Sequence, residues 1–278
     1  MRALNLGCGG RFHPDWENLD FAPASAAVRA HDLQKGIPFP DGTFDVVYHS
    51  HVLEHFPKQF APSFLRECHR VLKSGGVIRV AVPDLEAIAR IYLEALEKAS
   101  NSQPGWAENY DWIVLEMYDQ AVRERTCGSL AEFFCREVIP NWDFIYARWG
   151  SQAKITLDFL RAESKRDQNG SSRFGSKIGY ALRHPMRAVR KQLVKAMLDK
   201  EDYQAFQVAR FRRKGEIHQW MYDRYSLARS LRDSGFRDPV RREANESLIP
   251  GWTKFNLDTE PDGTVYKPDS IYMEAVKP

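Results

Sequence analysis

In the N-terminal part of the chain, short apolar runs alternate with turns rich in glycine, proline and aspartate. One further stretch, 61–73, places its apolar residues on a single helical face and ends at Ser74-Gly75-Gly76. Strands, turns and a helix in this order are typical of a doubly wound α/β sheet. The runs that we expect to form strands are Ala3–Leu6, 17–21, 28–33, Phe44–Ser50 and 77–83.

The first expected strand runs directly into a turn that contains Gly7, Cys8, Gly9 and Gly10. Glycine tolerates positive φ angles and leaves no Cβ atom between the main chain and a ligand. In open α/β sheets, ligands bind at the carboxyl ends of the strands, beside the first strand. The turn is therefore a candidate ligand site, although a tight turn without a ligand has the same pattern.

Acidic residues close the next two expected strands, with Asp20 at the end of the second and Asp32 at the end of the third. A carboxylate at the tip of the second strand, beside the glycine turn, suits the two hydroxyl groups of a ribose. Only a short segment separates Gly9 from Asp20. An intervening helix therefore has room for a turn or two at most.

Helical periodicity replaces the strand pattern between residues 84 and 214. Asp84 is a suitable N-cap for the first of these helices, and the polar stretch 164–176 is expected to be a mobile loop. We interpret residues 84–214 as a helical insertion, placed as a lid above the carboxyl edge of a core formed by 1–83 and 215–278. The helices are expected at 85–99, 107–125, 130–138, 143–163 and 178–198.

Composition narrows the class of protein. A chain of 278 residues with 43% hydrophobic residues can bury one good core with an insertion. The four cysteines lack C-x-x-C spacing and the N-terminus lacks a secretory signal pattern, so we expect reduced thiols in a cytoplasmic protein. No apolar run approaches the roughly 18 residues that span a membrane. The net charge of +3 does not by itself indicate binding to nucleic acid.

Taken together, the motifs of residues 3–83 resemble those of class I S-adenosylmethionine-dependent methyltransferases, in the broad branch that acts on small molecules. The stretch 225–236 resembles the last helix of that family, and Ser270–Val276 resembles its final antiparallel strand. The motifs that match are Gly7-Cys8-Gly9 after the first strand, Asp20 at the end of the second, Asp32-Leu33 at the end of the third, Phe44 to His55 across the fourth, and Arg70 to Gly76 before the fifth.

The resemblance implies a Rossmann-like sheet of seven strands with the last strand antiparallel, and S-adenosylmethionine as the cofactor. It implies that Asp20 holds the ribose, that Asp32 and Leu33 lie near the adenine, and that the two residues at the tip of the fourth strand line the methyl-donor site. The residues implied to contact the cofactor are Gly7, Cys8, Gly9, Asp20, Asp32, Leu33, His49 and Ser50.

Three features depart from the family pattern. Arg11 stands where a third glycine belongs, Asn5 stands where an acid is often seen, and the first helix has almost no residues. These departures support an alternative, a catalytically inactive protein that binds the cofactor in a regulatory role. A dinucleotide fingerprint is disfavoured because Phe12 occupies its last glycine position.

Transfer of a methyl group to a hydroxyl requires a positioned nucleophile, exclusion of water and removal of a proton. Histidine is a suitable general base near neutral pH. Candidates are His55, just beyond the fourth strand, and His218, in a stretch of polar and aromatic residues where the insertion returns to the core. A structural role for either histidine, in bracing or packing, is the alternative.

The same region contains the pattern His51-x-x-Glu54-His55, the order of an inverted zinc-protease motif. We disfavour a protease because the pattern follows a buried strand directly and Pro57 interrupts any long helix. Some quinone O-methyltransferases carry Glu-x-x-Glu-His at the matching place and hold a divalent ion there. No metal is assigned here, and the question stays open for the three residues.

Residues 154–214 hold 16 Lys or Arg against 6 Asp or Glu, a net charge of +10, so the remainder carries −7. Such a segment suits a phosphate-rich substrate or an anionic membrane surface, and a solvated helix face explains it as well. No nucleic-acid-binding module accompanies the charge. We expect O-methylation of a small or glycan-like acceptor, which can be phosphorylated. The sequence indicates no particular oligomeric state.

Overall fold

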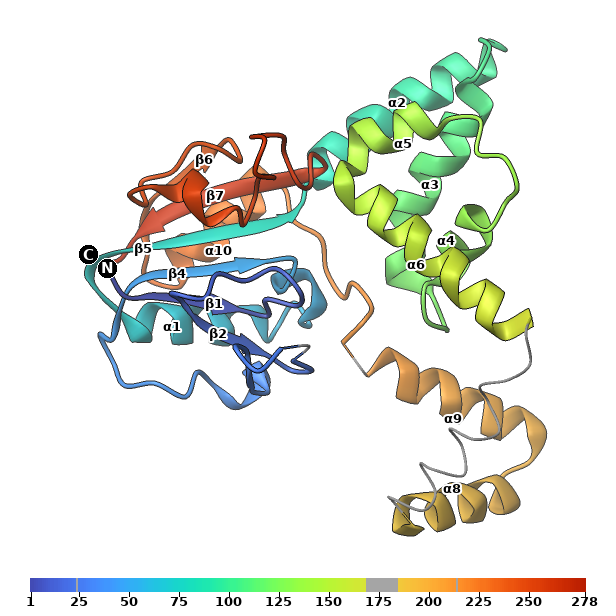
Figure 1. The fold of residues 1–278 in the computed structure, drawn as a ribbon, viewed down its shortest axis with the longest axis horizontal. Helices are drawn as coiled ribbons and strands as arrows, with labels where there is room; N and C mark the ends of the chain where they lie inside the picture. Colours follow the sequence, from blue (N-terminus) through green and yellow to red (C-terminus); the bar gives the residue numbers. More distant parts are fainter. Residues whose placement is uncertain (24, 169–184, 214) are drawn as a thin grey trace.

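The computed structural model describes residues 1–23, 25–168, 185–213 and 215–278, and these contain a seven-stranded sheet of order β3-β2-β1-β4-β5-β7-β6 (Figure 1). Strands β1 to β5 pair in parallel, and β7 pairs antiparallel with both β5 and β6. The predicted doubly wound sheet with an antiparallel last strand is therefore confirmed. The strands are β1 Ala3–Leu6, β2 Glu17–Asp20, β3 Arg29–Ala30, β4 Phe44–Ser50, β5 Leu72–Pro83, β6 Arg237–Arg242 and β7 Ser270–Val276.

Two helices cover one face of the sheet. The apolar side chains of α1 (Ala61–Val71) and α10 (Arg224–Asp233) pack with the inward residues of the strands in one core cluster. Asp223 caps α10 by accepting hydrogen bonds from the amides of Tyr225 and Ser226. This face matches the helices predicted from the sequence.

A long loop covers the opposite face, where a helix between β1 and β2 has no residues to form. Trp252, in the short helix η3 (Trp252–Phe255), packs with Trp16 and Tyr48 of the sheet side. The connection between β1 and β2 is too short to cover this face of the sheet, and the loop that contains η3 covers it instead.

Arg79, in the middle of β5, ties this loop to the sheet. Its guanidinium is fully buried and donates to Asp258 Oδ2 at 2.7 Å and to Glu274 Oε1 at 2.9 Å. The other donors reach three carbonyl oxygens of the loop, those of Glu243, Ala244 and Glu246. Every N–H of the guanidinium is therefore hydrogen-bonded, which a buried charge requires.

The insertion forms helices of its own beside the carboxyl end of β5 (Figure 1). Trp112 and Phe134 lie at the centre of its apolar core. Asp84 caps the first helix as predicted, through the amides of Glu86 and Ala87. The helices are α2 Leu85–Ser100, α3 Trp106–Val122, α4 Gly128–Phe134, α5 Trp142–Trp149, α6 Ser151–Gln168, α8 Pro185–Met197 and α9 Lys200–Arg212.

Some predicted elements differ from the structure. The third strand is only two residues long, because Asp32 instead caps the 3₁₀ turn η1 (Leu33–Lys35). The helix predicted at 143–163 is two helices, interrupted by Gly150 at φ +58°, where a Cβ atom would lie 2.7 Å from the carbonyl oxygen of Tyr266.

Other predictions concern regions that the structure leaves partly undescribed. The loop 164–176 and the start of the helix at 178–198 fall largely outside the described residues. The domain boundaries at 83/84 and 214/215 stay a prediction. None of the described helices combines the length and apolar character needed to cross a membrane.

The Arg79 contacts generate a prediction about stability. Arg79→Met leaves Asp258 and Glu274 buried without their cation, so we expect a loss of about 3–5 kcal/mol in the free energy of unfolding. Chemical denaturation of the variant measures it, with Arg232→Met, an exposed arginine on α10, as the control. Equal stability of the two variants would contradict this role for Arg79.

Candidate functional site

The turn after β1 is shaped by two glycines with different constraints. Gly7 has φ +63°, and a Cβ atom there would lie 2.4 Å from Val52 Cγ2. Gly9 has φ +54°, but a Cβ atom built on Gly9 or Gly10 meets no atom within 4 Å in the part of the chain that the structure describes. Gly7 is therefore required by packing, whereas the main chain at Gly9 is open to a ligand.

Asp20, at the end of β2, holds this turn in place. Its Oδ2 accepts a hydrogen bond of 2.8 Å from the Gly9 amide, and its Oδ1 accepts one of 2.8 Å from the Ala22 amide. A carboxylate has about four lone-pair positions, so acceptor capacity remains for the hydroxyl groups of a sugar.

Arg11 does not fill the space above the turn. Its guanidinium donates to the carbonyl oxygens of Asn256 at 2.9 Å and Thr259 at 2.6 Å, and it pairs with Glu260. It also lies over the Tyr266 ring, 3.7 Å from the centroid. The residue that replaces the third glycine is therefore held by the loop before β7, and it borders the same cavity as the glycines.

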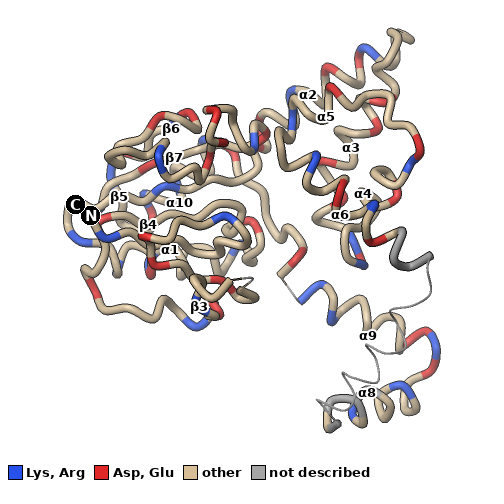
Figure 2. Tube along the Cα trace, in the orientation of Figure 1, with Lys and Arg blue, Asp and Glu red and all other residues tan. Residues whose placement is uncertain are grey.

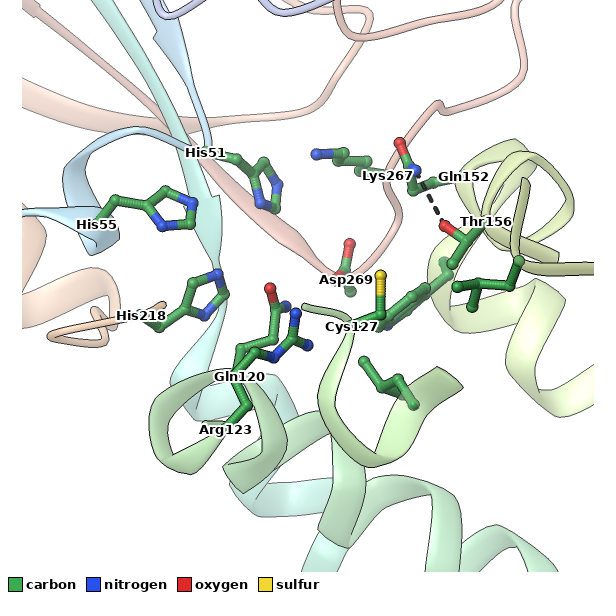
Figure 3. Close-up of a pocket in the computed structure, with 13 residues that line it drawn as sticks. His51, His55, Gln120, Arg123, Cys127, Gln152, Thr156, His218, Lys267 and Asp269 are labelled. Carbon is green, nitrogen blue, oxygen red and sulfur yellow. Dashed lines mark hydrogen bonds between the residues drawn. The ribbon is translucent and has the colours of Figure 1, made fainter. Parts of the chain in front are cut away.

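Three cavities meet at the carboxyl edge of the sheet. The Asp20 cavity, of about 590 Å³, is bordered by Asp20, Asp32 and Leu33 together with Gly7. The turn cavity, also about 590 Å³, lies over the glycines and Ser50. The helix cavity, about 250 Å³, lies between the sheet and the insertion (Figure 3). His51 and His55 border all three.

The helix cavity mixes an aromatic wall with polar side chains. Trp149 and two leucines form the apolar part, and Lys267 and Asp269 enter from the loop before β7 (Figure 3). Lys267 Nζ has no ion-pair or hydrogen-bond partner among the described residues. Further polar residues are Gln120 of α3, Arg123 just beyond α3, and Gln152 and Thr156 of α6.

Glu54, in the 3₁₀ turn η2 (Leu53–His55), lies fully buried among three histidines. His51 Nδ1 is 3.2 Å from Glu54 Oε1, and His218 Nε2 is 3.9 Å from the same oxygen. The rings of His55 and His218 are 4.9 Å apart, edge to face. His51 itself has φ +54°, an unusual backbone conformation for a non-glycine residue, and such strain is concentrated at functional sites.

The electrostatics of this cluster follow from burial and charge. Burial alone would raise the pKa of Glu54, but the hydrogen bond and positive charge of His51 outweigh it, with smaller contributions from His55 and His218 in their protonated forms, and hold that pKa well below its usual value. Burial lowers the pKa of His218 to about 3, although Glu54 opposes the shift. His218 is therefore neutral and weakly basic at neutral pH.

His55 differs from His218 in how its ring is held. Its Nδ1 is 3.0 Å from the carbonyl oxygen of Ile217, so this nitrogen carries the proton and donates. The other nitrogen, Nε2, then has a free lone pair. Among the histidines of the cluster, His55 thus has the arrangement expected of a base.

The ligand atoms of Glu54, His55 and His218 lie within 4.8 Å of one another. By donor type this set suits a divalent transition metal. His51 Nδ1 lies 3.2 Å from the Glu54 carboxylate, but neither carboxylate oxygen has a well-formed hydrogen bond among the described residues. The donor set alone assigns no ion.

The structure brings most of the predicted site residues to these cavities. Gly7, Asp20, Asp32 and Leu33 border the Asp20 cavity, and Cys8, Gly9 and Ser50 border the turn cavity. Burial, together with the charge of Asp20, raises the pKa of the Cys8 thiol to about 11, so Cys8 is not a thiolate at neutral pH. His55 and His218 border the helix cavity.

His49 lies elsewhere. Its side chain is fully buried against Phe64 of α1, neither ring nitrogen has a hydrogen-bond partner among the described residues, and it borders none of the three cavities. The expectation that His49 lines the methyl-donor site is not met, because it shares a face of β4 with Val47, whereas Ser50 faces the cavity.

A sheet of this order, with the glycine turn after β1 and Asp20 and Asp32 beyond the next two strands, is the Rossmann-like fold of class I methyltransferases. Residues 4–80 match the family model described as a methyltransferase domain. Over these residues the chain is thus similar to methyltransferase domains, whose cofactor is S-adenosylmethionine. The open main chain over Gly9 and the carboxylate of Asp20 fit that cofactor.

Two curated relatives match part of the chain. One, from Mycolicibacterium smegmatis, is named a probable S-adenosylmethionine-dependent methyltransferase and is 36% identical over 98 residues, 29% of this chain and 37% of the relative. The other, from Aspergillus luteorubrus, is named probable methyltransferase ltbC and is 37% identical over 57 residues, 20% of each chain. The chain thus spans well under half the length of either relative.

Among solved structures, a S-adenosylmethionine-dependent methyltransferase from Archaeoglobus fulgidus aligns over 99% of this chain and 86% of its own, with 11% identity and a TM-score of 0.37. At this level the similarity adds nothing to the assignment, which depends on the sheet order and on residues 4–80.

The contacts of Asp20 predict its effect on cofactor binding. Asp20→Ala removes an anchor of the glycine turn and the acceptor for ribose hydroxyls, so we expect the Kd for S-adenosylhomocysteine to rise about 10- to 100-fold. Calorimetric titration measures it, with Asp111→Ala, an exposed residue of α3, as the control. Unchanged affinity in Asp20→Ala would place the ligand elsewhere.

The position of His49 predicts a dependence of stability on pH. Burial lowers its pKa to about 4, although Glu54 opposes the shift, so the unfolded chain binds a proton at higher pH than the folded chain. Its contribution to stability is complete above about pH 6.5 and is lost as the pH falls toward 4.

We expect His49→Leu to reduce the loss of stability over this range by up to about 3 kcal/mol. Thermal unfolding at a series of pH values measures it, with His13→Leu as the control. Parallel curves for the parent and His49→Leu would show that His49 does not titrate in this way.

Proposed function

We propose that this protein is an O-methyltransferase that uses S-adenosylmethionine to methylate a hydroxyl group of a small, glycan-like acceptor. One observation supports it above others: the two cavities beside the glycine turn and the cavity beneath the insertion meet at His51 and His55. A donor bound over the turn and an acceptor bound among the helices would then face each other at these histidines.

The cofactor would be held by residues at the tips of the first three strands. Gly9 offers open main chain, Asp20 offers a carboxylate to the ribose, and Asp32 with Leu33 borders the far end of the same cavity. When bound, S-adenosylmethionine would supply a methyl group on a positively charged sulfur. The acceptor oxygen would bond to the methyl carbon in line with the C–S bond, and the sulfur would leave in S-adenosylhomocysteine.

We assign the removal of the acceptor proton to His55. Its Nδ1 donates to the carbonyl oxygen of Ile217, which leaves Nε2 to accept a proton from the hydroxyl as the new O–C bond forms. His218, the other predicted base, has a pKa lowered to about 3 by burial and is a poorer acceptor of protons. His218 instead packs against the His55 ring and fixes its position.

The lining of the helix cavity supports the acceptor class. An aromatic wall at Trp149 with amide and hydroxyl groups around it suits a sugar ring, which has apolar faces and polar edges. Lys267, without an ion-pair partner among the described residues, suits a phosphate or carboxylate on the acceptor. Burial lowers the pKa of Lys267, and Asp269 opposes the shift.

The alternative of an inactive cofactor-binding protein depended on Arg11 and the missing first helix. Arg11 is bound to the loop at 256–260 and leaves the turn open. The covering loop replaces the packing of the missing helix. We therefore favour an active enzyme, and its cytoplasmic location stays a prediction.

Turnover with a panel of hydroxylated sugars and their phosphates tests the proposal. We expect methylation of at least one acceptor, and we expect His55→Gln to lower kcat about 10²- to 10⁴-fold while the affinity for S-adenosylhomocysteine changes little. His13→Gln is the control. Cofactor binding without turnover on any acceptor would favour the inactive protein, and turnover unaffected in His55→Gln would remove the assigned base.

A further inference from the structure

Helix α8 carries an apolar stripe that faces solvent. Four of its apolar side chains recur at intervals of three, four and four residues, which places them on one helical face. They are 57–84% exposed, far more than core residues of this protein. The stripe consists of Met186, Val189, Leu193 and Met197.

The charge of the same segment has a single sign. Residues 185–198 contain four Lys or Arg and no Asp or Glu. Arg190 and Lys195 are both exposed. By helical spacing Lys195 lies opposite the stripe and Arg190 lies at its edge, and Figure 2 shows Lys and Arg in blue along α8. α8 therefore combines an apolar face with an excess of positive charge, the pattern of helices that lie in a membrane interface.

The helix is presented away from the sheet on an arm (Figure 1). The arm is α9, whose C-terminal end is anchored to α3 by Arg212, which donates to the carbonyl oxygen of Ala121 at 3.0 Å. Phe211, beside it, is buried. Arg213 and Gly215, directly beyond α9, border the Asp20 cavity. The arm thus joins the exposed helix to the site.

We propose that α8 docks this protein on the surface of a membrane that contains anionic lipids. The stripe enters the interface, and the basic side chains remain at the level of the headgroups. This inference goes beyond the proposed methyl transfer and does not depend on it.

Other occupants satisfy only part of the pattern. Two copies of α8 facing each other would bring positive charge against positive charge. A nucleic acid would use the charge but would leave the apolar stripe in water. An anionic lipid surface accommodates both the stripe and the charge.

Co-sedimentation with vesicles tests the inference. The probes are vesicles of phosphatidylcholine alone and of phosphatidylcholine with phosphatidylglycerol, each at low and high salt. We expect the full chain to bind the anionic vesicles at least tenfold more tightly, with weaker binding at high salt because the charges are screened.

Two double variants separate the stripe from general surface effects. Val189→Glu with Leu193→Glu should lower the affinity for anionic vesicles at least tenfold. Val138→Glu with Leu248→Glu, at sites that are 70% and 50% exposed outside α8, should bind as the parent does. Arg190→Glu with Lys195→Glu should abolish the preference for anionic vesicles.

Several results would overturn the inference: no binding to anionic vesicles, equal binding to neutral ones, or equal loss in the stripe and control variants. Self-association of the parent that the stripe variant loses, seen by sedimentation velocity without vesicles, would assign the stripe to a second copy of the chain. The affinity for S-adenosylhomocysteine, measured in every variant, confirms a folded core and tests the proposed function separately.

Discussion

The site depends on one buried carboxylate. Glu54 lies in η2, just beyond β4, with no exposure to solvent, and its main-chain carbonyl oxygen accepts hydrogen bonds from the amides of Gln219 at 2.7 Å and Trp220 at 3.2 Å. Its side chain faces three histidine rings. The residue therefore fixes both the main chain that returns from the insertion and the charge of the cluster, and an uncompensated carboxylate at this place would be strongly destabilising.

The loop that covers the outer face of the sheet explains how a short core can hold a complete site. The connection between β1 and β2 is too short for a helix, so the outer face of the sheet is covered by a loop from the C-terminal part, fixed by Arg79. That loop continues to Tyr266 and Lys267, which border the turn cavity. The loop between β6 and β7 thus both covers the sheet and completes the site.

Local patterns made most of the fold predictable, and distant contacts made the rest unpredictable. The strands, the glycine turn and Asp20 follow from alternation and spacing over a few residues. The burial of His49 could also have been predicted from the sequence, since alternation along β4 puts it on the core face with Val47. The interruption of the helix at Gly150 could not be predicted, because it depends on a close approach of the carbonyl oxygen of Tyr266, far along the chain. No sequence motif marks Lys267 and Asp269 as site residues, because the pairing of β7 with β5 brings them to the site.

The central claim is that donor and acceptor meet at His51 and His55. A crystal structure of the protein with S-adenosylhomocysteine tests it most directly. We expect the ribose hydroxyls on Asp20, the adenine beside Asp32 and Leu33, and the sulfur in the turn cavity facing the two histidines. A nucleoside bound elsewhere, or Arg11 moved over Gly9 so that the turn is closed, would contradict it.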